Sequence, residues 1–132
     1  MVCLRNFHSD RRLCILVVDD EEPVREVVAW MLQDAGHDVH EAADGFAALD
    51  FLRRHGPVDL VISDINMPGI DGLELSARAR RCWPGLPVLL ISGRPPPCGA
   101  NPFIPKPFRW DTLATAIDRL AKPGDWHRAG AN

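Results

Sequence analysis

The sequence lacks an apolar run long enough to cross a bilayer, because its longest apolar stretches are only as long as a β-strand. Residues 1–12 also lack an apolar core followed by a small-residue cleavage site, so they do not resemble a secretion signal. The lysines and arginines are scattered and the net charge is −3, so no basic patch typical of nucleic-acid binding is present. We therefore expect neither a membrane nor a nucleic-acid partner for this chain.

Paired cysteines are also missing. The four cysteines, at positions 3, 14, 82 and 98, form no C-x-x-C motif and no close pattern of the kind found in small secreted domains. This usage favours the cytoplasm, and Cys14 is expected to be inert in a buried strand. His37 and His40 lie three positions apart on an alternating strand, so we interpret them as solvated residues on opposite faces rather than as metal ligands.

Short apolar runs alternate with amphipathic segments, which predicts one domain with a parallel sheet flanked by helices. The predicted strands cover residues 13–18, 37–42, 59–63, 87–91 and 103–104. The predicted helices cover residues 23–35, 46–54, 73–81 and 110–121, and Asp71 is the expected N-cap of the third. The domain is expected to span residues 13–122, between a disordered lead-in (1–12) and a flexible tail (123–132).

Two stretches indicate where the strands lie and where a helix is missing. The run over 59–63 is almost continuously apolar and is predicted to be central, whereas 37–42 alternates and is predicted to lie near an edge. Between Ser92 and Pro105 the chain holds three consecutive prolines, which cannot sit in a helix interior. We expect a proline-rich, extended loop there in place of a helix.

Polar side chains follow four of the predicted strands. Asp19 and Asp20 come after the first, Asp64 after the third, Ser92 after the fourth and Lys106 after the fifth. Because the carboxyl ends of neighbouring parallel strands line one crevice, these side chains should converge. Three carboxylates together would repel one another, and Mg²⁺, which prefers oxygen ligands, would relieve that repulsion. A cation and a hydroxyl then remain for the oxygens of a phosphoryl group, so the sequence predicts a phosphoryl-transfer site.

Four motifs in this order resemble the receiver domain of two-component response regulators. They are residues 17–21 (VVDDE), 59–72 (DLVISDINMPGIDG), 90–93 (LISG) and 105–108 (PKPF). The resemblance covers roughly residues 13–122 and implies a doubly wound α/β fold of the flavodoxin type, with a five-stranded parallel sheet in the order 2-1-3-4-5. It also implies a signalling domain that catalyses its own phosphorylation rather than an enzyme that turns over a substrate.

The resemblance assigns a role to each polar residue of the predicted crevice. Asp64 would be the phosphoacceptor. Asp20, Asp64 and the backbone carbonyl of Asn66 would hold Mg²⁺, and Asp19 would act largely through a metal-bound water. Lys106 would pair with Asp64 and then with the phosphoryl oxygens. The Lys106–Pro107 peptide is expected to be cis, which costs little before proline and would direct the ammonium into the site.

The resemblance also implies a conformational switch. Ser92 would hydrogen-bond the phosphoryl group and be drawn towards it. Phe103 occupies the position of an aromatic residue that swings inward on activation, although a fixed core phenylalanine fits the sequence equally well. Arg94 could reach the phosphoryl group or shield it from water, and the sequence does not distinguish these roles.

The chain departs from most receivers in the missing helix between Ser92 and Lys106, and it resembles a subgroup in which that helix is lost or shortened. Dimerisation through the surface that includes this helix is therefore in doubt, and we expect a monomer or a weak dimer. A further hypothesis is that the 93–102 loop itself reports phosphorylation by becoming ordered.

The leading interpretation is a stand-alone receiver, since Met1 and the short tail favour a complete protein. It would accept a phosphoryl group from a sensor histidine kinase or a histidine phosphotransfer protein and pass the signal to an unknown downstream protein. One alternative is a phosphorylation-independent adaptor with the same fold. A second is a phosphatase of the haloacid dehalogenase type, but in that family the nucleophile precedes the acidic pair, and here the pair comes first.

Overall fold

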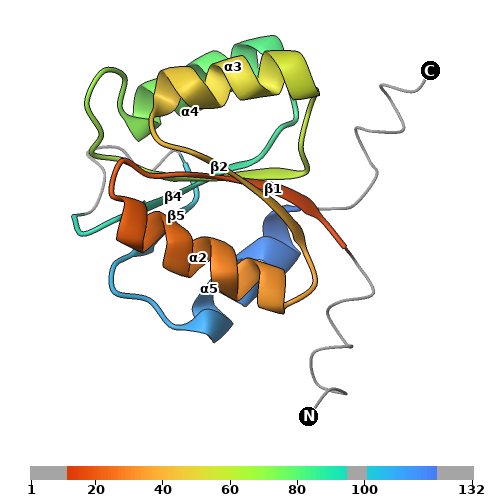
Figure 1. Cartoon of the computed structure of the whole chain (residues 1–132), viewed down its shortest axis with the longest axis vertical. Helices are drawn as coiled ribbons and strands as arrows, with labels where there is room; N and C mark the ends of the chain where they lie inside the picture. The colour runs from red at the N-terminus through yellow and green to blue at the C-terminus, as the bar shows by residue number, and fades with distance from the viewer. Residues whose placement is uncertain (1–11, 95–100, 122–132) are drawn as a thin grey trace.

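The computed structural model describes residues 12–94 and 101–121, which form a three-layer α/β domain (Figure 1). Five parallel strands make one sheet in the order β2-β1-β3-β4-β5. The strands are β1 (Cys14–Val18), β2 (Asp38–Ala42), β3 (Leu60–Asp64), β4 (Val88–Ser92) and β5 (Phe103–Pro105). The helices are α2 (Glu22–Asp34), α3 (Gly45–His55), α4 (Gly72–Cys82) and α5 (Trp110–Leu120). The predicted flavodoxin-like strand order is confirmed.

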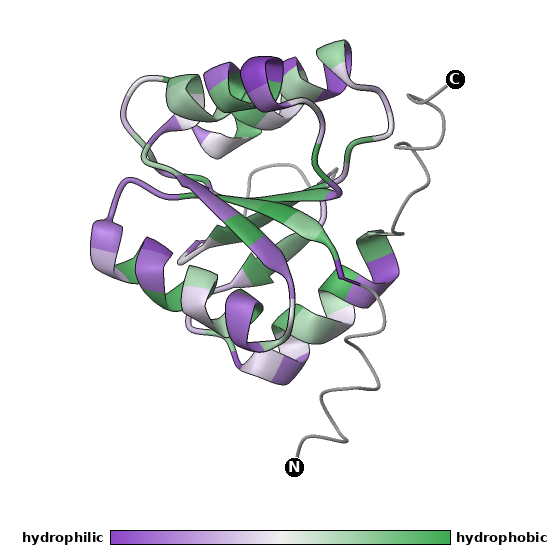
Figure 2. Ribbon diagram, turned by 45° about the vertical axis from the view of Figure 1, so that its right-hand side comes forward, coloured by the Kyte–Doolittle hydropathy of each residue, from purple (hydrophilic) through white to green (hydrophobic). Residues whose placement is uncertain are grey.

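The two faces of the sheet bury separate apolar cores. Successive residues of a strand point to opposite faces, so Leu16 and Val18 of β1 pack beneath α3 and α4, whereas Ile15 and Val17 pack against α2 and α5. Figure 2 shows the apolar strands between helices that turn polar sides outward. Strand β3 is buried along its whole length, as predicted for a central strand, and β2 lies at the edge of the sheet, as predicted, where only its last residue, Ala42, is buried.

Local signals in the sequence account for the helix starts. The Asp44 side chain accepts a hydrogen bond from the Ala47 amide at 2.8 Å, and the Asp71 side chain accepts one from the Glu74 amide at 2.8 Å. Both aspartates therefore cap helix N-termini, and the predicted cap at Asp71 is confirmed. Pro23 lies in the first turn of α2, where its missing amide hydrogen leaves no hydrogen bond unmade.

The element boundaries differ from the predicted ones by at most one residue at each end. Asp64 and Ser92 are the last residues of β3 and β4 rather than the residues that follow them, because the strand pairs Asp64–Ile91 and Ser92–Pro105 extend the ladder. In α5, Leu113 and Ile117 are buried, whereas Ala116 and Leu120 are only partly buried.

The connection between β4 and β5 contains no helix among its described residues, which are 93, 94, 101 and 102. This agrees with the predicted fold, although residues 95–100 of the proposed loop lie outside the described part of the chain. At its far end, the Asn101 amide donates a hydrogen bond to the buried Ser76 hydroxyl of α4 at 2.8 Å. The predicted lead-in (except Arg12) and the predicted tail also lie outside the described residues.

Among the helices that the structure describes, none has both the length and the apolar character needed to span a membrane.

Candidate functional site

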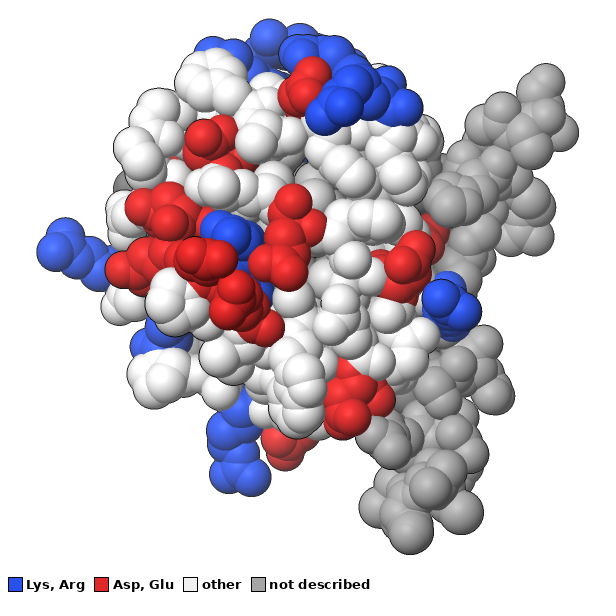
Figure 3. Space-filling view, viewed as in Figure 1, with Lys and Arg blue, Asp and Glu red and all other residues white. Residues whose placement is uncertain are grey.

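The predicted site residues lie at one edge of the sheet, where the strands end. In Figure 1 this edge is on the left, where β1 passes into α2. Figure 3 shows acidic side chains gathered over the same edge, while the basic side chains gather mainly over α3 and α4. The crevice that the topology predicts is therefore the acidic part of this face.

Asp19 and Asp20 follow β1 directly and differ in exposure. Asp19 is buried, and its Oδ1 accepts a hydrogen bond from the Glu21 amide at 2.9 Å. The Arg25 guanidinium donates to the Asp19 backbone carbonyl at 2.8 Å and pairs with Glu41 at 2.9 Å. Asp20 is exposed. One carboxylate is thus held in a defined orientation and its neighbour remains open to solvent.

Asp64 ends β3 inside the crevice and is only 8% exposed. The Lys106 ammonium lies 3.2 Å from Asp64 Oδ1 and 3.6 Å from Asp19 Oδ2. The backbone positions this lysine, because the Lys106 amide donates to the Ser92 carbonyl at 2.8 Å. The Lys106–Pro107 peptide is cis, as predicted.

The electrostatics of the crevice favour a divalent cation. Burial raises the pKa of the Asp64 carboxyl and the nearby Asp19 charge raises it further, while Lys106 acts in the opposite direction. One carboxylate oxygen from each of Asp19, Asp20 and Asp64 lies within 4.8 Å of the other two. One ammonium beside three carboxylates leaves two negative charges unmatched, and these hard oxygen donors fit Mg²⁺.

A glycine brings the next helix close against the phosphoacceptor candidate. A Cβ atom at Gly72 would lie 2.4 Å from the Asp64 carbonyl oxygen, and the Gly72 amide donates to the Ile65 carbonyl at 2.8 Å. The first turn of α4 therefore packs directly against the end of β3, which fixes the backbone that carries Asp64.

The remaining predicted residues, Ser92, Asn66 and Phe103, differ in their burial and in their contacts. Ser92 is fully buried at the end of β4, and its hydroxyl accepts a hydrogen bond from the Arg94 amide at 3.2 Å. Asn66 is exposed in the loop after β3, two positions beyond Asp64. Phe103 begins β5, is partly buried, and packs against the core beneath α3 and α4. It also lines a groove beside α5.

An apolar groove opens beside the acidic cluster. It has a volume of about 660 Å³ and is lined by residues of α2 and of the turn after β5: Pro23, Val24, Val27, Val28, Met31, Lys106, Pro107 and Phe108. Val27 belongs to the apolar stripe of α2, yet it is 58% exposed. The groove therefore combines unburied apolar surface with the one lysine of the candidate site.

Sequence reasoning missed a second group of side chains. Cys14, His40 and His55 lie together, although three separate elements carry them. His40 is only partly exposed, and His37 precedes β2 and accepts a hydrogen bond from the Leu13 amide at 3.2 Å, so the interpretation of both as solvated strand residues is wrong. Burial raises the pKa of the Cys14 thiol to about 11, assisted by the charges of Asp38 and Asp59. No spacing in the sequence indicates this group, because the three side chains come together only through strand register and helix packing.

The chain matches proteins of one family over most of its length. The sequence model of the response regulator receiver domain matches residues 15–118. The chain is 37% identical to sensor kinase CckA of Brucella abortus over 120 residues, which are 84% of this chain and 13% of that protein. It is 35% identical to response regulator MprA of Mycobacterium sp. (strain KMS) over 116 residues, which are 82% of this chain and 50% of that protein. The chain thus spans half or less of these two curated relatives.

Solved structures give the same result. The receiver domain of the hybrid histidine kinase CckA is 42% identical, with a TM-score of 0.72 and coverage of 83% of this chain and 99% of that one. The response regulator TrrA of Thermotoga maritima, solved in complex with Mg(2+)-BeF, is 33% identical, with a TM-score of 0.74 and coverage of 81% and 97%. A structure of histidine kinase ThkA in complex with TrrA matches with 33% identity, a TM-score of 0.74 and coverage of 83% and 98%. With its sheet order, its acidic crevice and these matches, the chain belongs to the response regulator receiver domain family.

Proposed function

We propose that this chain is a phosphorylation-dependent signalling domain that accepts a phosphoryl group on Asp64 in a Mg²⁺-dependent reaction. The observation that carries the proposal is the contact of the Lys106 ammonium with Asp64 Oδ1 at 3.2 Å, inside a cluster of three carboxylates whose oxygens lie within 4.8 Å. A carboxylate can act as a covalent nucleophile, and phosphoryl transfer depends mainly on alignment and charge neutralisation.

In the proposed step an Asp64 carboxylate oxygen forms a bond to phosphorus while the phosphorus–nitrogen bond of a phosphohistidine breaks. The electron pair of that bond returns to the imidazole of the donor. Lys106 neutralises the phosphoryl oxygens, and the buried Ser92 hydroxyl, at the neighbouring strand end, donates to one of them. Asp19, Asp20, Asp64 and the Asn66 carbonyl would hold Mg²⁺, which supplies further positive charge to the same oxygens when it is bound. The complex of TrrA with Mg(2+)-BeF supports this assignment.

The phosphoryl donor is proposed to be a histidine kinase or a histidine phosphotransfer protein in the cytoplasm. The complex of ThkA with TrrA supports a kinase as the partner. We propose the apolar groove between α2 and the turn after β5 as the docking surface, because Lys106, which contacts Asp64, lines it and Val27 leaves apolar area uncovered within it. Phosphorylation would then change the surface seen by a downstream protein through Ser92 and Phe103. The absence of a described helix between β4 and β5 supports assignment to the subgroup in which that helix is lost or shortened.

Intact mass spectrometry after incubation with a small phosphodonor and Mg²⁺ tests the chemistry. We expect the mass of one phosphoryl group to be added to the wild-type chain, and neither Asp64→Asn nor a metal-free sample to gain it. An unmodified wild-type chain under these conditions and with a phosphorylated kinase would favour the adaptor interpretation instead.

A charge placed in the groove tests the docking surface separately. Val27→Glu should slow transfer from a phosphorylated protein donor and leave transfer from a small phosphodonor unchanged. Phe46→Glu is the matched control, because Phe46 is a similarly exposed apolar residue on α3, on the other face of the sheet. Equal slowing by both variants would remove the groove from the proposal.

A further inference from the structure

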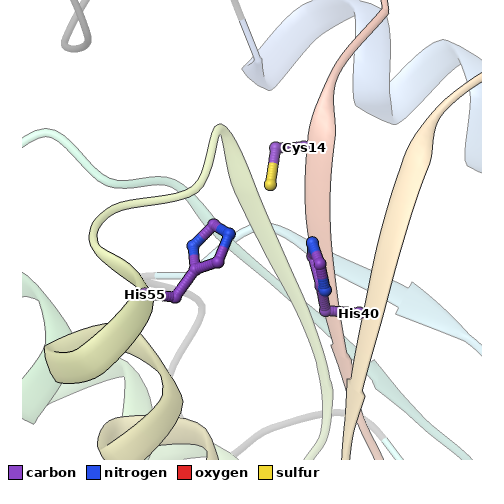
Figure 4. A group of neighbouring side chains, drawn as sticks. All are labelled: Cys14, His40 and His55. Atoms are coloured by element: carbon purple, nitrogen blue, oxygen red, sulfur yellow. The ribbon is translucent and has the colours of Figure 1, made fainter.

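A cysteine and two histidines converge at the end of the sheet that the phosphoacceptor site does not use. Cys14 is the first residue of β1, His40 lies in β2 and His55 is the last residue of α3. One donor atom from each lies within 4.8 Å of the other two. Figure 4 shows the sulfur of Cys14 placed between the two imidazole rings, with a ring nitrogen of each on the side facing it. Cys14 precedes Asp19 by five positions along an extended strand, roughly 16 Å, so this group is separate from the acidic crevice.

Strand register explains why these side chains meet. Cys14 pairs with Asp38 across the β1–β2 ladder, and His40 lies two positions further along β2, so its side chain is on the same face as that of Asp38. Cys14 packs against the core on the α3 side of the sheet. Phe51 stacks on His55 at a centroid distance of 4.6 Å and also contacts the His40 ring at 4.9 Å. The last turn of α3 is thereby held over the pair of strands.

Two further observations point to a ligand between these rings. His40 Nε2 is buried and has no hydrogen-bond partner within the described residues, and the Asp38 carboxylate oxygen Oδ2 lies 3.5 Å from it, too far for a good hydrogen bond. A buried imidazole nitrogen without a partner is unfavourable unless something fills the gap. His55 Nδ1 lies 3.3 Å from the Gly56 carbonyl oxygen. When Nδ1 carries the proton and donates it to that carbonyl, Nε2 keeps a free lone pair for a ligand. Metal-binding histidines usually have their second nitrogen held in this way.

We propose that Cys14, His40 and His55 form a binding site for a divalent transition metal of the zinc class. A thiolate and two imidazoles are the donors that Zn²⁺ selects, whereas Mg²⁺ prefers oxygen atoms. The Asp38 carboxylate or a water would complete four-coordination. On binding, the sulfur–hydrogen bond of Cys14 is exchanged for a sulfur–metal bond and the proton is released to solvent. The metal would join β1, β2 and α3, and it would stabilise the fold by mass action.

Cobalt spectroscopy on the intact chain tests this proposal with a readout independent of phosphorylation. Titration with Co²⁺ should give one equivalent with a thiolate-to-cobalt charge-transfer band and the visible bands of a tetrahedral site, and Zn²⁺ should displace it. A variant with Cys3, Cys82 and Cys98 all replaced by serine should keep the spectrum, because Cys14 is then the only thiol. Asp64→Asn should also keep it, since the acidic crevice offers no sulfur.

Ligand variants separate a metal site from simple ring packing. Cys14→Ser should abolish the charge-transfer band, and His55→Ala, at an exposed position, should weaken Co²⁺ affinity by at least about tenfold, because even the loss of a second-shell partner has an effect of that size. A spectrum without a thiolate band, or one unchanged in a folded His55→Ala variant, would overturn the proposal. In that case the histidines serve only to pack against Phe51. Should Cys14→Ser fail to fold, the His55→Ala result decides.

Discussion

The ammonium of Lys106 lies 3.2 Å from Asp64 Oδ1, although 42 positions separate the two residues in the chain. The same ammonium lies 3.6 Å from Asp19 Oδ2. The single charge of Lys106 is therefore shared between two carboxylates of the cluster. Because Lys106 contacts both a proposed metal ligand and the proposed phosphoacceptor, its charge should affect Mg²⁺ binding and phosphorylation in opposite directions.

Replacing Lys106 separates these two effects. In Lys106→Met, Mg²⁺ affinity measured by calorimetry should rise several-fold, because a positive charge next to the metal ligands is gone. Phosphorylation by a small phosphodonor, followed by intact mass, should slow by on the order of 100-fold, since a charge aimed at the phosphoryl oxygens is lost. Arg109→Met is the control, because the Arg109 side chain in the same turn is 85% exposed, and it should change neither quantity. Parallel losses of affinity and rate in Lys106→Met would contradict this division.

Because the pKa of the Asp64 carboxyl is raised in the folded state, the stability of the fold should depend on pH. A carboxyl whose folded-state pKa is above its unfolded value contributes stability at pH below the unfolded pKa, about 3.9, and loses it as the pH rises through the folded pKa. Without divalent cations at neutral pH, Asp64→Asn should therefore melt a few degrees above the wild type. The difference should vanish in acid. Asp50→Asn, at an exposed position of α3, should show no such gain.

Addition of Mg²⁺ should raise the melting temperature of the wild type, which the charged Asp64 carboxylate lowers in the absence of the ion. At a concentration a hundred times the dissociation constant, a ligand that binds only the folded state stabilises it by about 2.7 kcal/mol. Thermal unfolding with and without Mg²⁺ should show this gain for the wild type and little of it for Asp64→Asn or Asp20→Asn. An equal gain in all three proteins would place the metal elsewhere.

Gly72 is predicted to be the glycine on which the position of Asp64 depends. In Gly72→Ala the new methyl group would lie 2.4 Å from the Asp64 carbonyl oxygen and 2.9 Å from the Ile65 Cα, both backbone atoms that cannot move cheaply. We expect a loss of about 1–3 kcal/mol in the free energy of unfolding, measured by urea denaturation. Gly93→Ala is the control for stability, because a Cβ atom there meets nothing within 4 Å.

The hydrogen bond from Asn101 to Ser76 predicts how the end of the β4–β5 connection is attached to α4. Asn101→Ala should cost about 1–2 kcal/mol, because it removes a donor from a buried hydroxyl. The double variant with Ser76→Ala should recover part of that loss, and a double-mutant cycle in urea measures the coupling. Strictly additive losses would show that the two groups do not support each other.

The sequence by itself determined the parallel sheet and the edge where the site lies. Continuous apolar runs in 59–63 and 87–91 can be buried on both faces only in a sheet covered by helices, and polar residues at their ends must then meet at one edge. For this reason Asp19, Asp20, Asp64, Ser92 and Lys106 could be assigned to one crevice before any coordinates.

Only the tertiary structure decided the contacts that depend on register and packing. Strand pairing extends β3 and β4 by one residue and so includes Asp64 and Ser92 in the sheet. Register across β1 and β2, with the last turn of α3 above them, brings Cys14 to His40 and His55. The position of α2 beside the turn after β5 leaves Val27 exposed in a groove. Periodicity specifies the face of an element on which a side chain lies, but the neighbour across that face is set by elements distant in sequence, and so no local pattern contains it.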